Sequence, residues 1–267
     1  MNQERHFNND WRKVAMAIYR KPVDSKIFGT VELDVTELEA FVQEKRRQGL
    51  RITLMHPMIL FVGRALREAV PELNCYVRRG RMIAREHVNA MVSVLLGQGQ
   101  QLGQALITDV DSITLAELSA ALQQTVSAAR KGRENKTMGM KSMLAAIPWP
   151  VRGWVLGIVK WLTIDLGLSI PALGISPNSF GSIVISNIGS LGLDVGYAAL
   201  MPVSNVSMVL TMGSVQTKPA VVDGQIVPRR ILTLSAVFDH RVVDAAHAGL
   251  LFRYLKKAIR APEAAIE

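Results

Sequence analysis

The sequence is poor in the residues and runs from which disulfide frameworks and membrane spans are built. Cys75 is the single cysteine among 267 residues, so the chain has no internal disulfide. Its first fifteen residues hold no apolar segment of the secretory type. No uncharged run in its most apolar stretch, residues 136–178, approaches the about 18 residues that cross a bilayer. We therefore expect a cytoplasmic protein without a transmembrane helix.

Acidic residues are in the minority, with 22 Asp and Glu against 31 Lys and Arg and a formal charge of +9. The excess gathers between Arg130 and Lys160, where seven basic residues accompany one acid, Glu134. Such a segment fits nucleic acid, an anionic membrane or a phosphate-bearing ligand, and a solvated basic face is the plain alternative. The nearby tryptophans lie in an apolar stretch rather than among the basic residues, so we expect no nucleic-acid binding.

The composition is that of a globular protein, with 49% hydrophobic and 20% charged residues. Its length allows a substantial core, and we expect one domain over residues 1–267 that carries an apolar, basic insert at about 136–178. Strand patterns predict strands near 26–34, 182–186, 207–215 and 230–238, and two or three strands over 76–83 and 90–96. Helical spacing predicts helices near 11–20, 36–49, 57–70, 114–130 and 243–259. Strands and helices do not strictly alternate, which favours an α/β fold: a two-layer sandwich with a mixed β-sheet.

Local signals mark several boundaries. Thr36 with Glu39, and Thr114 with Glu117, have the spacing of capping boxes that open helices. The pair Asp223-Gly224 predicts a turn between two strands.

Glycines at 97, 99 and 103 suggest a phosphate-binding loop at first sight. Their spacing is one residue off the dinucleotide fingerprint, and the strand-like sequence ALIT follows where a helix belongs. We therefore predict no dinucleotide site there.

The stretch FDHRVVDAAHAG at 238–249 places His240 where a predicted strand runs into a predicted helix. Asp244 and His247 follow at helical spacing. A metal site of these three side chains would require His240 to share the helical face, and we do not expect one. An imidazole beside a carboxylate on a turn instead indicates acid–base chemistry, with His247 in a packing or surface role.

The sequence FDHRVVD resembles the DHRxxDG active-site motif of the dihydrolipoyl acyltransferase catalytic domains of 2-oxoacid dehydrogenase complexes. Chloramphenicol acetyltransferase shares that fold and has a related HxxxDG motif. ISNIGSLG at 185–192 resembles the family's ISNLGxxG, and VELDVTELEAF, ITLMHPMILFVGRALREAVPELN and ITDVDSITLAEL resemble further family segments in the same order. The resemblance therefore covers most of the chain and implies a chloramphenicol acetyltransferase-like fold.

The resemblance implies a homotrimer whose active sites lie in channels between subunits, with CoA entering at one end and the acyl acceptor at the other. The family histidine matches His240, its hydroxyl residue matches Ser186 of the neighbouring subunit, and its carboxylate matches Asp244. The expected substrate is CoA or acyl-CoA, without a metal. No lipoyl group is expected on this chain, so a lipoyl substrate would arrive on another protein.

Acyl transfer between thiols requires these residue types. A thiol with a pKa of about 8.5 is mostly protonated at neutral pH, and an imidazole is a suitable base for it. We expect His240 to take that proton and Ser186 to donate to the oxyanion of the tetrahedral intermediate, without a covalent acyl-enzyme. Asp244 is expected to orient the turn by pairing with an arginine such as Arg12 or Arg20.

The sequence also departs from the family pattern. Ala245 stands where the motif has glycine, and a required positive φ or close ligand approach there would be penalised. We expect no lipoyl or subunit-binding segment before the core. The insert is longer than the family's link, and the ending RAPEAAIE lacks the family's apolar C-terminus, so we expect a lone trimer rather than a cage. A non-catalytic trimeric scaffold is the alternative function. The insert is open to three roles: binding CoA phosphates, contacting a membrane through Trp149 to Trp161, or forming a lid or trimer contact.

Overall fold

A computed structural model describes residues 25–79, 81–96, 101–130, 148, 151–169, 177, 179–200 and 204–266. Its strands are β1 (Lys26–Asp34), β2 (Cys75–Arg78), β3 (Arg81–Ala84), β4 (Ala90–Leu96), β5 (Gln101–Ile107), β6 (Ile183–Asn187), β7 (Met208–Val222) and β8 (Gln225–Asp239). Its helices are α3 (Thr36–Arg47), α4 (Met55–Glu68), α5 (Leu115–Arg130), α7 (Val151–Lys160), α8 (Ala245–Arg260) and α9 (Pro262–Ile266). Shorter turns are η1 (Pro71–Asn74), the π-helical η3 (Trp161–Asp165) and η5 (Gly189–Leu191). The predicted helix at 11–20 and the glycines at 97 and 99 lie outside the described residues.

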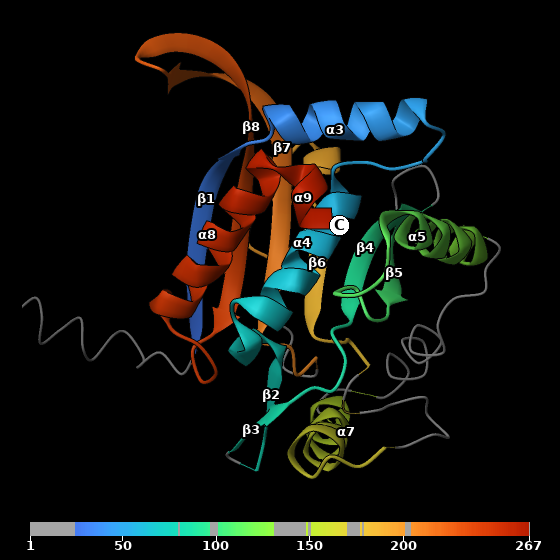
Figure 1. Cartoon of the computed structure of the whole chain (residues 1–267). Helices are drawn as coiled ribbons and strands as arrows, with labels where there is room; N and C mark the ends of the chain where they lie inside the picture. The colour runs from blue at the N-terminus through green and yellow to red at the C-terminus, as the bar shows by residue number, and fades with distance from the viewer. Residues whose placement is uncertain are drawn as a thin grey trace, which may run out of the picture.

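Six strands form one sheet in the order β1-β8-β7-β6-β4-β5, and β2 and β3 form a separate hairpin (Figure 1). Strand β6 runs parallel to both β4 and β7, while the other neighbours are antiparallel. The sheet is therefore mixed, as the irregular order of predicted strands and helices indicated. This confirms the α/β sandwich expected from the sequence.

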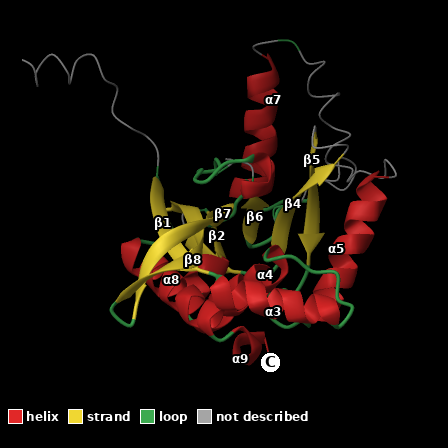
Figure 2. Cartoon of the chain, turned by 90° about the horizontal axis from the view of Figure 1, so that it is seen from above, coloured by secondary structure: helices red, strands yellow, loops and turns green. Residues whose placement is uncertain are grey.

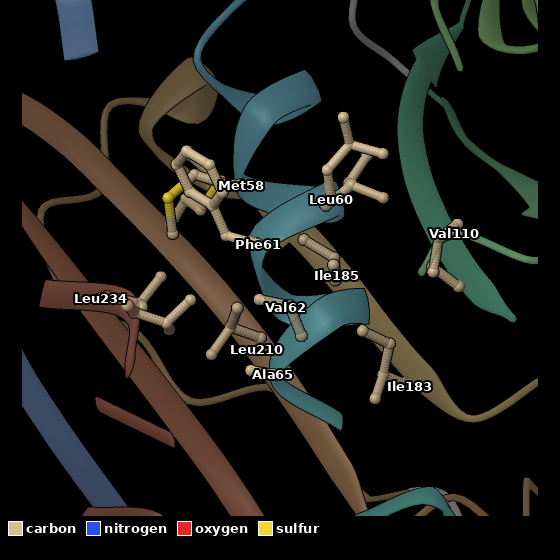
Figure 3. Packing of buried hydrophobic residues seen from close by; sticks show 14 of the residues in the cluster. Met58, Leu60, Phe61, Val62, Ala65, Val110, Ile183, Ile185, Leu210 and Leu234 are labelled. Carbon is tan, nitrogen blue, oxygen red and sulfur yellow. The ribbon is translucent and has the colours of Figure 1, made fainter. Parts of the chain in front are cut away.

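The core lies between the six-stranded sheet and a helical layer made of α3, α4, α8 and α9 (Figures 1 and 2). Helix α4 is the centre of that layer, with ten of its 14 residues buried. Figure 3 shows Phe61 and Val62 of α4 beside Ile185 of β6 and Leu210 of β7. We call the opposite side of the sheet the far face. Helix α7 stands on that side (Figure 2).

Three local predictions differ from the structure in detail. Thr36 and Glu39 do not form the predicted capping box: Asp34 accepts hydrogen bonds from the backbone N and hydroxyl of Thr36, and Glu39 pairs with Arg230 at 2.8 Å. The helix predicted from Pro57 begins two residues earlier, at Met55. Of the two or three strands predicted over 76–83 and 90–96, the first range holds the hairpin of β2 and β3 and the second holds β4.

Other local predictions are confirmed. Thr114 and Glu117 form the reciprocal capping box, in which Thr114 N donates to the Glu117 carboxylate and Glu117 N donates to the Thr114 hydroxyl. Asp223 and Gly224 join β7 to β8 with φ of 51° and 79°, the two positive values that a tight hairpin turn requires. Among the described residues, the helices are all too short or too polar to cross a membrane.

Candidate active site

His240 lies on the turn between β8 and α8, and this turn fixes which ring nitrogen holds a proton. Its Nδ1 is 2.9 Å from the carbonyl oxygen of Val243, and its backbone N donates to the carbonyl of Ser25 at 2.6 Å. A carbonyl oxygen only accepts hydrogen bonds, so Nδ1 carries the proton of the neutral ring and Nε2 is left with its lone pair. The side chain is exposed. The turn therefore presents one basic nitrogen to solvent or substrate.

Asp239, the residue before His240, anchors this turn. Its carboxylate accepts from the guanidinium of Arg241, with Nη2 at 2.6 Å, and from the hydroxyl of Ser25 at 3.1 Å. Its backbone N donates to the carbonyl of Ser207, the residue before β7. The motif alone did not single out Asp239, because its partner Ser25 is more than 200 residues distant in the chain. It acts as a positioning residue for the histidine.

The anchoring carboxylate should make stability depend on acid pH. Burial raises the pKa of Asp239, but hydrogen bonds from Arg241, its charge and the Ser25 hydroxyl outweigh burial and hold that pKa below its usual value. The stabilisation is complete above the unfolded pKa of about 3.9 and is lost as the pH falls through the lower folded pKa. Urea unfolding between pH 5 and pH 2 should therefore show a shallower loss of stability for Asp239→Asn than for the wild type. Equal slopes would contradict this assignment.

Asp244 begins α8 as its N-cap. Its side chain accepts from the backbone N of Ala246 at 2.8 Å and of His247, and the ring of His247 reaches back to complete a capping box. Hydrogen bonding from Ala246 and His247 lowers the pKa of Asp244. His247, expected to be a packing or surface residue, is part of this cap. The arginines proposed as partners, at 12 and 20, lie outside the described residues.

Substitutions of Asp244 distinguish a structural role as N-cap from a direct role in proton transfer. We expect Asp244→Ala to lower the melting temperature by a few degrees and to slow any His240-dependent turnover, because the helix that fixes the turn frays. Asp244→Asn should behave like the wild type in both, since an amide oxygen also caps. Thr114→Ala, which removes the cap of α5, is the matched control that lowers the melting temperature without affecting turnover. A loss of turnover in Asp244→Asn equal to that in Asp244→Ala would indicate proton exchange instead.

Ala245 is the first residue of α8, directly after the cap. It is not among the described non-glycine residues with positive φ. The left-handed backbone that would have demanded glycine is therefore not used at this position, and alanine is a good helix former.

Ser186 lies on the far face at the end of β6 and is half-buried. Strand register aligns it within a row of hydroxyl side chains that crosses five strands: Ser93, Ser186, Thr211, Ser235 and Thr30. The loop after Ser186 folds back over this row, where Gly196 accepts from the Thr211 hydroxyl. The loop packs directly on Gly213 of β7. Only glycine permits this approach, since a Cβ on Gly213 would lie 1.9 Å from the backbone oxygen of Asp194.

One chain does not bring Ser186 and His240 together. Ile183 of β6 is level with Met208 and Phe238, and Ser186 lies three residues beyond this level while His240 lies two residues beyond it in the opposite direction. At about 3.3 Å per residue, the two are separated by about 17 Å along the strands, with two strand spacings added across the sheet. Joint action of the two side chains therefore requires two chains.

Asp244 and His247 are engaged with each other in the cap of α8. Within the described parts of the chain, no three His, Cys, Asp or Glu side chains are grouped so that they could hold a metal ion. The sequence had predicted no metal site of His240, Asp244 and His247, and the capping role of the last two gives them other partners.

The mixed sheet and the histidine turn agree with the family comparison. The family model "2-oxoacid dehydrogenases acyltransferase (catalytic domain)" matches residues 15–139 and 175–267. The chain therefore belongs to this acyltransferase family. Residues 140–174, which the family model leaves unmatched, fall within the insert expected at 136–178.

Individual relatives support the assignment. The chain is 24% identical over 245 residues to the dihydrolipoyllysine-residue acetyltransferase component of the acetoin cleaving system of Bacillus subtilis, covering 89% of this chain and 50% of that protein. Two solved structures, the cubic core of a pyruvate dehydrogenase complex and the dihydrolipoamide acetyltransferase of Azotobacter vinelandii, each match with 20% identity and a TM-score of 0.65, over 92% of this chain and 85% of theirs. Chloramphenicol acetyltransferase shares the fold, with a TM-score of 0.51 and 12% identity over 94% of this chain and 96% of that one. The chain spans half or less of the first curated relatives' own length.

Proposed function

We propose that this protein is a CoA-dependent acyltransferase that moves an acyl group between CoA and a thiol such as dihydrolipoamide, or another small acceptor. The observation that carries the proposal is the contact of His240 Nδ1 with the Val243 carbonyl oxygen at 2.9 Å. Because that oxygen can only accept, the contact assigns the proton to Nδ1 and leaves Nε2 to act as the base. Membership of the acyltransferase family supplies the reaction class.

The reaction needs one proton to be moved twice. Nε2 of His240 removes the proton of the acceptor thiol as its sulfur attacks the thioester carbonyl of acyl-CoA. The hydroxyl of Ser186 donates to the oxyanion of the resulting tetrahedral intermediate. Collapse breaks the bond to the CoA sulfur, and the imidazolium returns the proton to the departing thiolate. The products are the acyl thioester of the acceptor and free CoA, and His240 ends in its starting state.

The proposal includes a site shared between subunits of a homotrimer. In the Azotobacter vinelandii enzyme, a serine, a histidine and an asparagine have been investigated for their role in the catalytic mechanism, and the asparagine follows the histidine by four residues. Asp244 follows His240 by the same interval, and Ser186 precedes it by a similar distance. The separation of Ser186 from His240 within one chain also supports a site between chains. A cubic core among the structural relatives supports oligomeric assembly.

Further parts of the proposal rest on the sequence. We place the enzyme in the cytoplasm, as one catalytic domain with an insert at 136–178, and we expect a lipoyl-bearing acceptor to be carried by another protein. A contact of the region 149–161 with a membrane is a separate possibility, which vesicle co-sedimentation tests.

A non-catalytic trimeric scaffold is the alternative function. Two sequence features suggest it: Ala245 in place of the family glycine, and the long insert. Ala245 lies in ordinary helical backbone, so its replacement of glycine causes no conformational strain. The acyltransferase is therefore the function that the site supports better.

The test is the release of free CoA from a panel of acyl-CoA thioesters in the presence of dihydrolipoamide. Turnover by the wild type and its loss in His240→Ala are expected. Equal rates for the two proteins would contradict the enzyme, and an absence of CoA binding by calorimetry at millimolar CoA would favour the scaffold.

A further inference from the structure

Helix α7 and η3 form an arm that leaves its apolar side chains in solvent. No described side chain of α7 is buried, although most of the helix is apolar. Trp154, Ile158 and Trp161 are 77%, 55% and 55% exposed. Their spacing of four and three residues places them on one stripe of the helix. An apolar stripe with two tryptophans indicates a binding surface, because single exposed apolar residues are ordinary but a contiguous set is not.

The arm is fixed at the end of the sheet that carries His240. Thr163 and Ile164 of η3 are buried, η3 contacts β2, and Gly167 packs so closely on Arg78 of β2 that a Cβ there would lie 2.5 Å from its guanidinium. Asp239 chiefly, and Asp165 of η3 as well, raise the pKa of Arg241, so η3 lies within electrostatic reach of the histidine turn. From this root α7 points away from the sheet on the side of the far face: it is seen nearly end-on in Figure 1 and lengthwise in Figure 2.

The far face also carries a second exposed apolar surface, the loop patch. It consists of Phe28, Leu191, Leu193, Val195 and Tyr197, which are between 47% and 61% exposed. The patch is ordered by contacts within the chain: Tyr197 packs edge-on against Phe28 with ring centroids 5.3 Å apart, and its hydroxyl bonds to Thr30. Most of the patch lies on the loop directly after Ser186.

A second copy of this chain is the occupant that accounts for both surfaces. The arm and the loop patch are both exposed to solvent in a single chain. If the arm of one chain packs on the loop patch of another, both apolar surfaces become buried. Such a pairing joins different surfaces of identical subunits, which is the heterologous contact that closes a ring. It also joins the end of the sheet that carries His240 in one chain to the loop that follows Ser186 in the next. A membrane would cover the arm but would leave the loop patch and the separation of the two residues without an explanation.

We infer that the arm of each subunit docks on the loop patch of the next subunit, as a contact added to the shared site of the proposed function. The inference rests on the proposed function for the shared site, but the contact itself can be measured without any turnover. Because the family model leaves 140–174 unmatched, the arm is an addition of this chain to the family core.

Cysteine cross-linking tests the contact. In a Cys75→Ser background, Trp154→Cys in one chain and Val195→Cys in a differently tagged chain are co-expressed and treated with a short bismaleimide. We expect a cross-linked species that contains both tags. The matched control pairs Trp154→Cys with Val221→Cys, which is 72% exposed at the far end of β7, and should give no such species. Ile158→Cys replaces Trp154→Cys if the latter does not fold.

The outcomes separate the contact from the catalytic proposal. Cross-linking in an inactive protein upholds the contact and contradicts the enzyme, whereas turnover without cross-linking from either arm position overturns the contact. Equal cross-linking of the test and control pairs also overturns it, since it would report random collision. If cross-linking fails and Trp154→Ser abolishes co-sedimentation with phosphatidylserine vesicles, the arm binds lipid and the contact is again overturned.

Discussion

Replacing His240 by alanine is expected to lower the rate of CoA release by a factor of about 10² to 10⁴, the usual contribution of a positioned general base. The side chain is exposed and its ring packs in no core, so the melting temperature should change little. The rate loss reflects the missing proton acceptor: without Nε2, the acceptor thiol must lose its proton to solvent before its sulfur attacks. Free CoA is first separated from the acceptor thiol by rapid chromatography and is then measured with a thiol reagent.

His87→Ala is the matched control for this measurement. His87 is also an exposed histidine that bonds to a neighbour, with its Nδ1 2.7 Å from the carboxylate of Asp109, but it belongs to the loop before β4. Its replacement should leave the rate of CoA release at the wild-type value. A fall in rate for both variants alike would point to a general structural effect, and an unchanged rate in His240→Ala would remove the histidine from the mechanism.

Mixing two inactive variants is expected to restore about one quarter of the wild-type activity. Ser186→Ala alone should lose a factor of about 10² to 10³, the cost of one oxyanion donor, and His240→Ala should be slower still. In a ring assembled at random from equal amounts, a given interface has one chance in two of receiving an intact His240 and one in two of receiving an intact Ser186 from the next chain. About one site in four is then complete, as heterologous ring contacts require.

The arrangement of the assay decides whether the site is shared. The two variants are co-expressed in equal amounts with different tags, and the unfractionated oligomers are compared with each variant expressed alone. In a trimer, the fraction that is retained by both tags contains no uniform rings, and one of its three sites should then be complete. Recovery only in the co-expressed sample supports a site between chains. No recovery in verified mixed oligomers would mean that each chain supplies its own serine and histidine, contrary to the separation of about 17 Å along the strands estimated at 3.3 Å per residue.

Elements whose signals are local agree between sequence and structure. β1 has the predicted bounds because its alternation reflects one buried face, and the turn at Asp223-Gly224 follows from the conformations these two residues tolerate. The capping box of Thr114 needs only residues within one helical turn. The place of His240 between a strand and a helix is likewise set by the periodicity on either side of it.

Tertiary structure decided what depends on pairing between distant segments. Glu39 leaves its expected cap because Arg230, almost two hundred residues later, offers an ion pair. The hydroxyl row around Ser186, the anchoring of Asp239 by Ser25 and the exposure of the arm all follow from register and packing. A sequence states which residues alternate, but the register between strands depends on the free energy of the whole packed sheet. For this reason the sequence by itself indicated the residues of the site, and only the tertiary structure placed Ser186 and His240 on different strands and at different levels of the sheet.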